Sequence, residues 1–165
     1  MELIYAVEAH YLIEELLEFK ELIFNETECM DYTNLFFIYQ SQKEADIAKE
    51  LLIEGDIYID NHDLVKLSGG TQGECYYDYC LPSEKNSCVY LYKDLLSCFY
   101  IKSGEDTSIQ MFKYQLEEHL VYQTLHQSKD YFFIDNALQE LILGTAKAYD
   151  IEVSFFDLDK LAKKI

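Results

Sequence analysis

The chain has 165 residues, half of them apolar, and its 31 carboxylates face only 13 lysines, because it contains no arginine. The formal charge of −18 opposes direct binding to nucleic acid and to anionic membranes, since a surface this negative repels phosphates. We therefore expect one acidic globular domain over residues 1–165, with neither nucleic acid nor membrane as a direct partner.

The first expected element is a helix from about Ala6 to Phe24. Its apolar residues recur at a spacing of 3.6 residues. The predicted inward side is made of Tyr5, Ala9, Leu12, Ile13, Leu16, Leu17, Phe19 and Ile23. Residues 25–31 are typical of a loop, and the aromatic run 35–39 is typical of a buried strand.

The middle of the chain predicts a second helix and a hairpin. Ser41 and Glu44 form a capping box that begins a helix, and Gly55 ends it. Residues 56–60 and 64–67 alternate as strands do, with a turn expected at Asn61–His62. Residues 68–86 hold three of the six glycines and the only proline, so we expect an irregular segment there.

The last third predicts a mixture of strands and helices. The expected elements are a hairpin of strands 88–92 and 97–102, helices over 107–127 and 136–149, a strand over 151–156 and a terminal helix over 157–165. Together these patterns predict an α+β fold in which about four helices pack on a mixed or antiparallel sheet.

No catalytic or metal-binding motif is present, so we assign no catalytic residue, metal or cofactor. The chain has five cysteines and no secretion signal at its start, which predicts reduced thiols in the cytoplasm. The gaps between Cys75, Cys80, Cys88 and Cys98 hold four, seven and nine residues, unlike the short ligand pairs of zinc modules. We read these cysteines as buried apolar side chains, and a metal or redox role for them stays open.

Negative charge is concentrated in the first part of the chain. Residues 1–63 hold 16 acids and 3 lysines, whereas residues 64–165 hold 15 acids and 10 lysines. One interpretation is a solvated acidic coat that keeps the protein soluble. The other is a docking surface for a basic protein, in which complementary potential speeds association and selects the partner. The expected partner-binding residues are Glu14, Glu18, Glu21, Glu26, Glu28 and Asp31.

These patterns favour a non-enzymatic inhibitory protein that occludes a basic target, such as a nuclease, a toxin or a defence effector. Such proteins include immunity proteins, antitoxins and phage anti-defence or anti-CRISPR-like proteins that mimic DNA. The alternatives are a small cytosolic enzyme with a site of cysteine and histidine, and a structural or adaptor subunit. The oligomeric state stays open.

Overall fold

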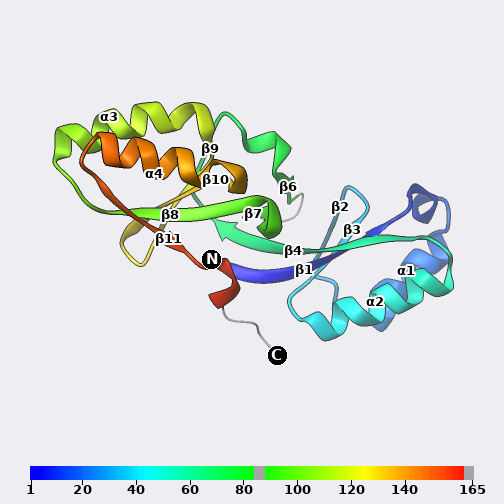
Figure 1. Ribbon diagram of the computed structural model, residues 1–165. Coiled ribbons are helices and arrows are strands. Elements are labelled where there is room, and N and C mark those ends of the chain that lie inside the picture. Colours follow the sequence, from blue (N-terminus) through cyan, green and yellow to red (C-terminus); the bar gives the residue numbers. More distant parts are fainter. Residues whose placement is uncertain (84–87, 162–165) are drawn as a thin grey trace. The chain divides into compact units, whose positions relative to one another are not determined.

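The computed structural model describes residues 1–83 and 88–161 (Figure 1). These residues form four α-helices and two antiparallel sheets, which confirms the predicted α+β class. They divide into two compact units. Unit 1 comprises Met1–Lys66 and Leu81–Tyr92, and unit 2 comprises Leu67–Cys80 and Lys93–Leu161. That the whole chain acts as one domain stays a prediction.

Unit 1 is built on a six-stranded sheet whose order is β2-β3-β1-β4-β7-β6. Its elements follow the chain as β1 (Glu2–Ala9), α1 (Leu17–Glu26), β2 (Asp31–Thr33), β3 (Phe36–Tyr39), α2 (Gln42–Glu54), β4 (Tyr58–Ser68), β6 (Cys80–Pro82) and β7 (Cys88–Tyr92). Helices α1 and α2 contact each other and lie on the same side of this sheet (Figure 1).

The expected first helix is wrong over its first half, because Glu2–Ala9 is the strand β1. Residues Leu3 to Val7 are all buried, as in a strand that lies inside a sheet and is covered on both faces. A continuous apolar run fits a helix and a buried strand equally well, so periodicity alone misassigned it. A short 3₁₀ turn, η1 (Tyr11–Glu14), follows, and α1 begins only at Leu17.

The expected turn at Asn61–His62 is also wrong. Strand β4 continues through both residues, and Asn61 pairs with Val7 and His62 with Ala6 of β1. Asn61 is exposed and His62 half-buried, so their polar side chains do not oppose a continuous strand.

The predictions for β3 and α2 are confirmed. Strand β3 covers four of the five residues expected, and α2 ends just before Gly55. The Ser41 hydroxyl accepts a hydrogen bond from the Glu44 backbone N–H at 3.4 Å, as a capping residue should. The Glu44 carboxylate accepts a hydrogen bond from the Glu28 backbone N–H, and not from Ser41 as expected for a capping box. It thereby fixes the chain after α1.

Unit 2 is built on a five-stranded sheet whose order is β11-β8-β10-β9-β5. Its main elements are β5 (Thr71–Gln72), β8 (Leu96–Ser103), α3 (Asp106–Leu116), β9 (Leu120–His126), β10 (Lys129–Asp135), α4 (Gln139–Ala148) and β11 (Glu152–Phe156). Helices α3 and α4 contact each other (Figure 1). The predicted last strand and the helix before it are confirmed.

Two expectations for the last part of the chain are wrong. The helix expected over 107–127 ends at Leu116, and residues 120–126 form strand β9 instead. Strands β7 and β8 do not pair as a hairpin, because they belong to different sheets. The expected terminal helix is only the 3₁₀ turn η6 (Leu158–Lys160) as far as Leu161, and residues 162–165 lie outside the described residues. The segment 68–86 contains β5, η2 (Tyr76–Asp78) and β6. Its residues 84–86 also lie outside the described residues.

The two units share one topology. Each has the element order βαββαβ, and its four main strands, numbered along the chain, lie in the order 4-1-3-2 with antiparallel neighbours. This arrangement is the split βαβ, or ferredoxin-like, topology. The hairpin between strands two and three has a two-residue turn with positive φ in both units, at Asn34–Leu35 and at Gln127–Ser128.

The second helix also ends in the same way in both units. Asp56 and Asp150 adopt left-handed φ values of 54° and 56°, and each follows the C-cap residue of its helix. The next N–H bonds back to the last helical turn, from Ile57 to the Leu52 carbonyl at 3.0 Å and from Ile151 to the Ala146 carbonyl at 2.9 Å. Both ends are Schellman motifs, in which such bonds satisfy free helix carbonyls.

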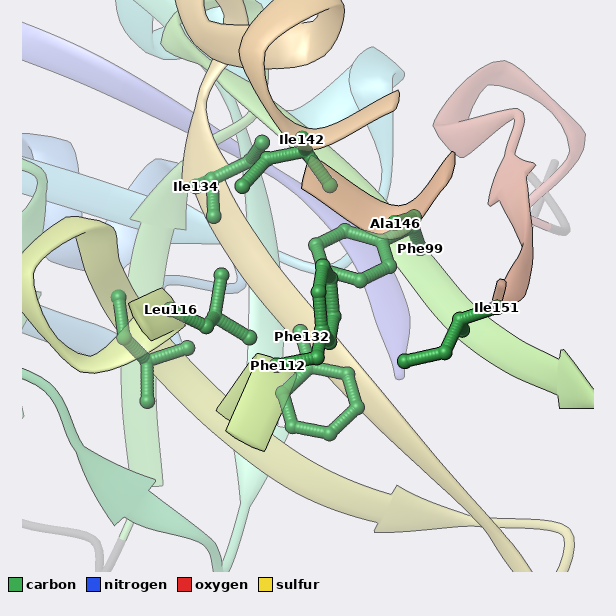
Figure 2. Packing of buried hydrophobic residues seen from close by; sticks show 9 residues of the cluster. Phe99, Phe112, Leu116, Phe132, Ile134, Ile142, Ala146 and Ile151 are labelled. Atoms are coloured by element: carbon green, nitrogen blue, oxygen red, sulfur yellow. The ribbon is translucent and has the colours of Figure 1, made fainter. Parts of the chain in front are cut away.

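The core of unit 2 is an aromatic cluster between its sheet and its two helices (Figure 2). The ring of Phe99 stacks on Phe132 with centroids 5.4 Å apart and meets Phe112 edge-on at 6.3 Å. Unit 1 has its own cluster on one face of its sheet, made of Ile4, Ala6, Phe36, Ile38, Leu64, Leu81, Cys88 and Tyr90. None of the described helices has both the length and the apolar content of a membrane span.

Candidate partner-binding surface

The connection between the first strand and the first helix distinguishes the two units. In unit 2 only Gly104 and Glu105 join β8 to α3. In unit 1 residues 10–16, which include η1, join β1 to α1. The shared topology does not require this longer connection. Segments added to a common scaffold often carry binding residues. The surface formed by residues 10–16 and α1 is therefore the candidate binding site.

Five of the six expected partner-binding residues are exposed, and four of these lie on α1 or in the loop after it. Glu18, Glu21 and Glu26 belong to this helix, and Glu28 lies in the loop that follows it. The described residues provide no lysine or histidine in ion-pair contact with any of these four carboxylates. Their charge is therefore available to a partner.

Glu14 is held within unit 1 instead. Its carboxylate accepts a hydrogen bond from the Lys20 ammonium at 2.8 Å and one from the Tyr32 hydroxyl at 2.5 Å. The Lys20 ammonium also lies 3.9 Å from the centre of the Tyr32 ring. The bonds from Lys20 and Tyr32 lower the pKa of Glu14, and burial raises the pKa of the Tyr32 hydroxyl. This contact attaches η1 to α1 and β2.

We expect Glu14→Gln to lower the free energy of unfolding by about 0.5 kcal/mol at neutral pH, as for other exposed ion pairs. Because the folded state lowers the pKa of Glu14, its contribution is complete above the unfolded pKa and is lost as the pH falls through the folded value. The difference between wild type and variant should therefore shrink from about pH 5 towards pH 3 in urea denaturation. A constant difference over this range would contradict the assignment. The exposed neighbour Glu15 provides the control, Glu15→Gln.

Asp31 does not belong to the exposed surface, since only 1% of it is accessible. Its carboxylate accepts hydrogen bonds from the Tyr90 hydroxyl at 2.9 Å, the Ser83 hydroxyl at 2.5 Å and the Tyr32 backbone N–H at 2.9 Å. Burial raises the pKa of the Tyr90 hydroxyl. Asp31 thus joins β2 to residues 83 and 90 of unit 1 and has a structural role.

Exposed leucines beside these acids were missed from the sequence: Leu16 and Leu17 were expected on the inward side of the first helix, and Leu22 was given no role. Leu16 is 44% exposed, Leu17 63% and Leu22 40%. In α1 the side chain of Ile23 is buried, whereas those of Leu17 and Leu22 are exposed. A hollow of about 710 Å³ in unit 1 is lined by Glu15, Leu16, Leu17, Glu18, Phe19 and Leu22. The signal in the sequence was the pair Leu16–Leu17 between the acids at 14, 15 and 18.

Charge differs between equivalent helices of the two units. Helix α1 carries three acids and one lysine, and α2 carries four acids and two lysines. Helices α3 and α4 each carry one acid and one lysine. A coat that served only solubility would not need this difference between helices of the same topology. The excess acid belongs to the helices of unit 1.

The cysteines gain no chemical role from the structure. All five are free thiols, and burial raises the pKa of Cys75, Cys80 and Cys98, which disfavours the reactive thiolate. Within the ranges 1–83 and 88–161, no three His, Cys, Asp or Glu side chains are grouped as metal ligands. A site made of cysteine and histidine thus has no geometric support in this part of the chain.

Comparisons with protein-family models, with curated proteins and with solved structures gave no match for this chain.

Proposed function

We propose that this chain is a non-enzymatic inhibitory protein that binds and occludes a basic protein through the acidic surface of α1. The observation that carries the proposal is the presence on α1 of three exposed carboxylates, those of Glu18, Glu21 and Glu26, which make no ion pair with described residues. Uncompensated like charges destabilise a fold, so their concentration on one helix favours a role in binding.

The chemistry of the surface indicates the class of partner. Carboxylates attract lysine and arginine, and a negative surface steers a basic protein into the right encounter. Proteins that bind nucleic acid carry such basic surfaces, so a nuclease, a toxin or a defence effector fits this role. On this proposal the protein acts in the cytoplasm as an immunity protein, an antitoxin or an anti-defence protein.

Removal of the three charges tests the proposal. The variant Glu18→Gln/Glu21→Gln/Glu26→Gln and the matched control Glu105→Gln/Glu117→Gln/Glu140→Gln have the same net charge, and the control residues are exposed in unit 2. We expect the first variant to bind a lysine homopolymer about tenfold more weakly than wild type at low salt, and the control to lose much less.

The salt dependence of binding supplies the second part of the test. Binding of wild type to the lysine homopolymer, which offers positive charge but no large apolar side chain, should be lost in about 1 M salt, where the Debye length is about 3 Å. Equal losses in the two variants, or binding that persists unchanged in high salt, would overturn the proposal.

A further inference from the structure

The hollow beside the acids adds a second kind of contact to this surface. Its lining combines four apolar side chains with two carboxylates, Glu15 and Glu18. Three leucine side chains are 40–63% exposed, and covering them lowers the free energy because their apolar surface leaves water. A lysine-rich partner without apolar side chains would leave these leucines in contact with water. The hollow therefore indicates that the partner presents apolar groups as well as positive charge.

The secondary structure of the site restricts how such a partner can bind. Backbone groups inside α1 are already bonded within the helix, so the site offers no strand edge for β-augmentation. Contact must run through side chains. Leu17 and Glu21, and likewise Glu18 and Leu22, are four residues apart and form two neighbouring rows along the outer side of α1. Rows of this kind pack into the grooves of another helix.

We infer that the partner segment is a basic amphipathic helix: its apolar side chains enter the hollow at Leu16, Leu17 and Leu22, and its flanking lysine or arginine residues pair with Glu15, Glu18 and Glu21. This inference rests on the proposed function and narrows it to one class of partner. The apolar contact supplies affinity that salt does not screen, and the carboxylates supply orientation and association rate.

The hollow itself is fixed by contacts inside unit 1. Ile23 of α1 is fully buried, and the ring of Phe24 lies 5.4 Å from Phe37 of β3. The contact of Glu14 with Lys20 and Tyr32 holds η1 against the first half of α1 and against β2. The leucines are thus presented by an anchored helix and an anchored turn, and little ordering is needed on this side when a partner binds.

The test uses the full chain and two synthetic peptides of equal composition. One peptide places leucine and lysine at helical amphipathic spacing, and the other has the same residues in scrambled order. We expect the amphipathic peptide to bind at least about tenfold more tightly than the scrambled one in isothermal titration calorimetry. Equal affinities would overturn the inference.

Two variants separate this inference from the proposed function. Leu17→Ser/Leu22→Ser should weaken binding of the amphipathic peptide about tenfold and leave binding of a lysine homopolymer unchanged. The control Leu125→Ser alters a leucine of unit 2 that is 70% exposed and should change neither. If the leucine variant has no effect while Glu18→Gln/Glu21→Gln weakens both ligands, the inference fails and the proposed function stands.

Other outcomes are equally decisive. If Glu18→Gln/Glu21→Gln changes neither affinity, the proposed function itself fails.

Light scattering of the free chain tests whether a second copy of the chain occupies the hollow. A dimer that Leu17→Ser/Leu22→Ser dissociates would assign the hollow to a second copy of the chain and overturn the inference, whereas a monomer in both forms supports it.

Discussion

Phe99→Ala should destabilise unit 2 by about 3–5 kcal/mol, the cost of removing a large aromatic side chain from a packed core. Phe99 is fully buried, and its ring contacts those of Phe112 and Phe132 (Figure 2). It also contacts the ring of Phe155, and the centroid distances to the three rings are 5.4–6.3 Å. The truncation would remove these contacts and leave a cavity between the sheet and both helices.

Hydrogen exchange followed by mass spectrometry measures this effect segment by segment. In Phe99→Ala the amides of β8 and β10 should exchange faster, by the factor that corresponds to a loss of about 3–5 kcal/mol. Phe99→Leu keeps most of the volume and should cost about 1 kcal/mol, so the prediction stays testable if the alanine variant does not fold. A loss below about 1 kcal/mol for Phe99→Ala would contradict the core assignment. The exposed Leu125→Ala is the control, with a change within about 0.5 kcal/mol.

Asp31→Ala should destabilise unit 1 by about 2 kcal/mol, because it removes the acceptor that the Tyr90 and Ser83 hydroxyls share. Both hydroxyls would then lose a hydrogen bond at a site where Asp31 and Tyr90 are almost completely buried. Replacement of a buried polar group by a smaller apolar one also leaves unfilled space.

Exchange protection of β2 and β7 measures the effect of Asp31→Ala. Asp31→Asn should cost less, since its amide oxygen still accepts hydrogen bonds. Asp46→Ala, at an exposed position of α2, should change stability by at most about 0.5 kcal/mol. If Asp31→Ala were as mild as Asp46→Ala, the hydrogen-bond network would not stabilise unit 1.

Local signals in the sequence predicted some elements well. The capping residue Ser41 and the bounded aromatic run of β3 identified their elements because each depends on nearby residues only. Strand β1 was mistaken for a helix because its burial on both faces depends on strands far along the chain. The hairpin expected of β7 and β8 was wrong for the same reason: the two strands follow each other in the sequence, but each pairs with distant strands of a separate sheet.

The repeated topology has only a faint trace in the sequence. Phe36-Phe37-Ile38 recurs as Phe132-Phe133-Ile134, and Asp-Ile follows the second helix in each unit. These short matches mark positions where geometry restricts the residue, a buried central strand and a left-handed helix end. Elsewhere many residues satisfy the same topology, so the repeat is visible only in the structure.

The candidate site was predicted in part. The acids of α1 were identified correctly as exposed, because like charges at helical spacing seldom enter a core. Leu16 and Leu17 were assigned to the core, because they were expected to continue a helix from Ala6, whereas α1 begins only at Leu17. Asp31 was placed with the exposed acids, because its hydroxyl partners Ser83 and Tyr90 lie more than 50 residues away, at separations of 52 and 59.

Cross-linking tests the central claim most directly, because it reports where a basic partner lies. A carbodiimide joins carboxylates to lysines that are in contact, so the amphipathic lysine peptide can be coupled to the full chain and the sites read by mass spectrometry. We predict that the coupled carboxylates are Glu15, Glu18 and Glu21. Coupling spread evenly over the exposed acids of both units, or concentrated in unit 2, would contradict a binding surface on α1.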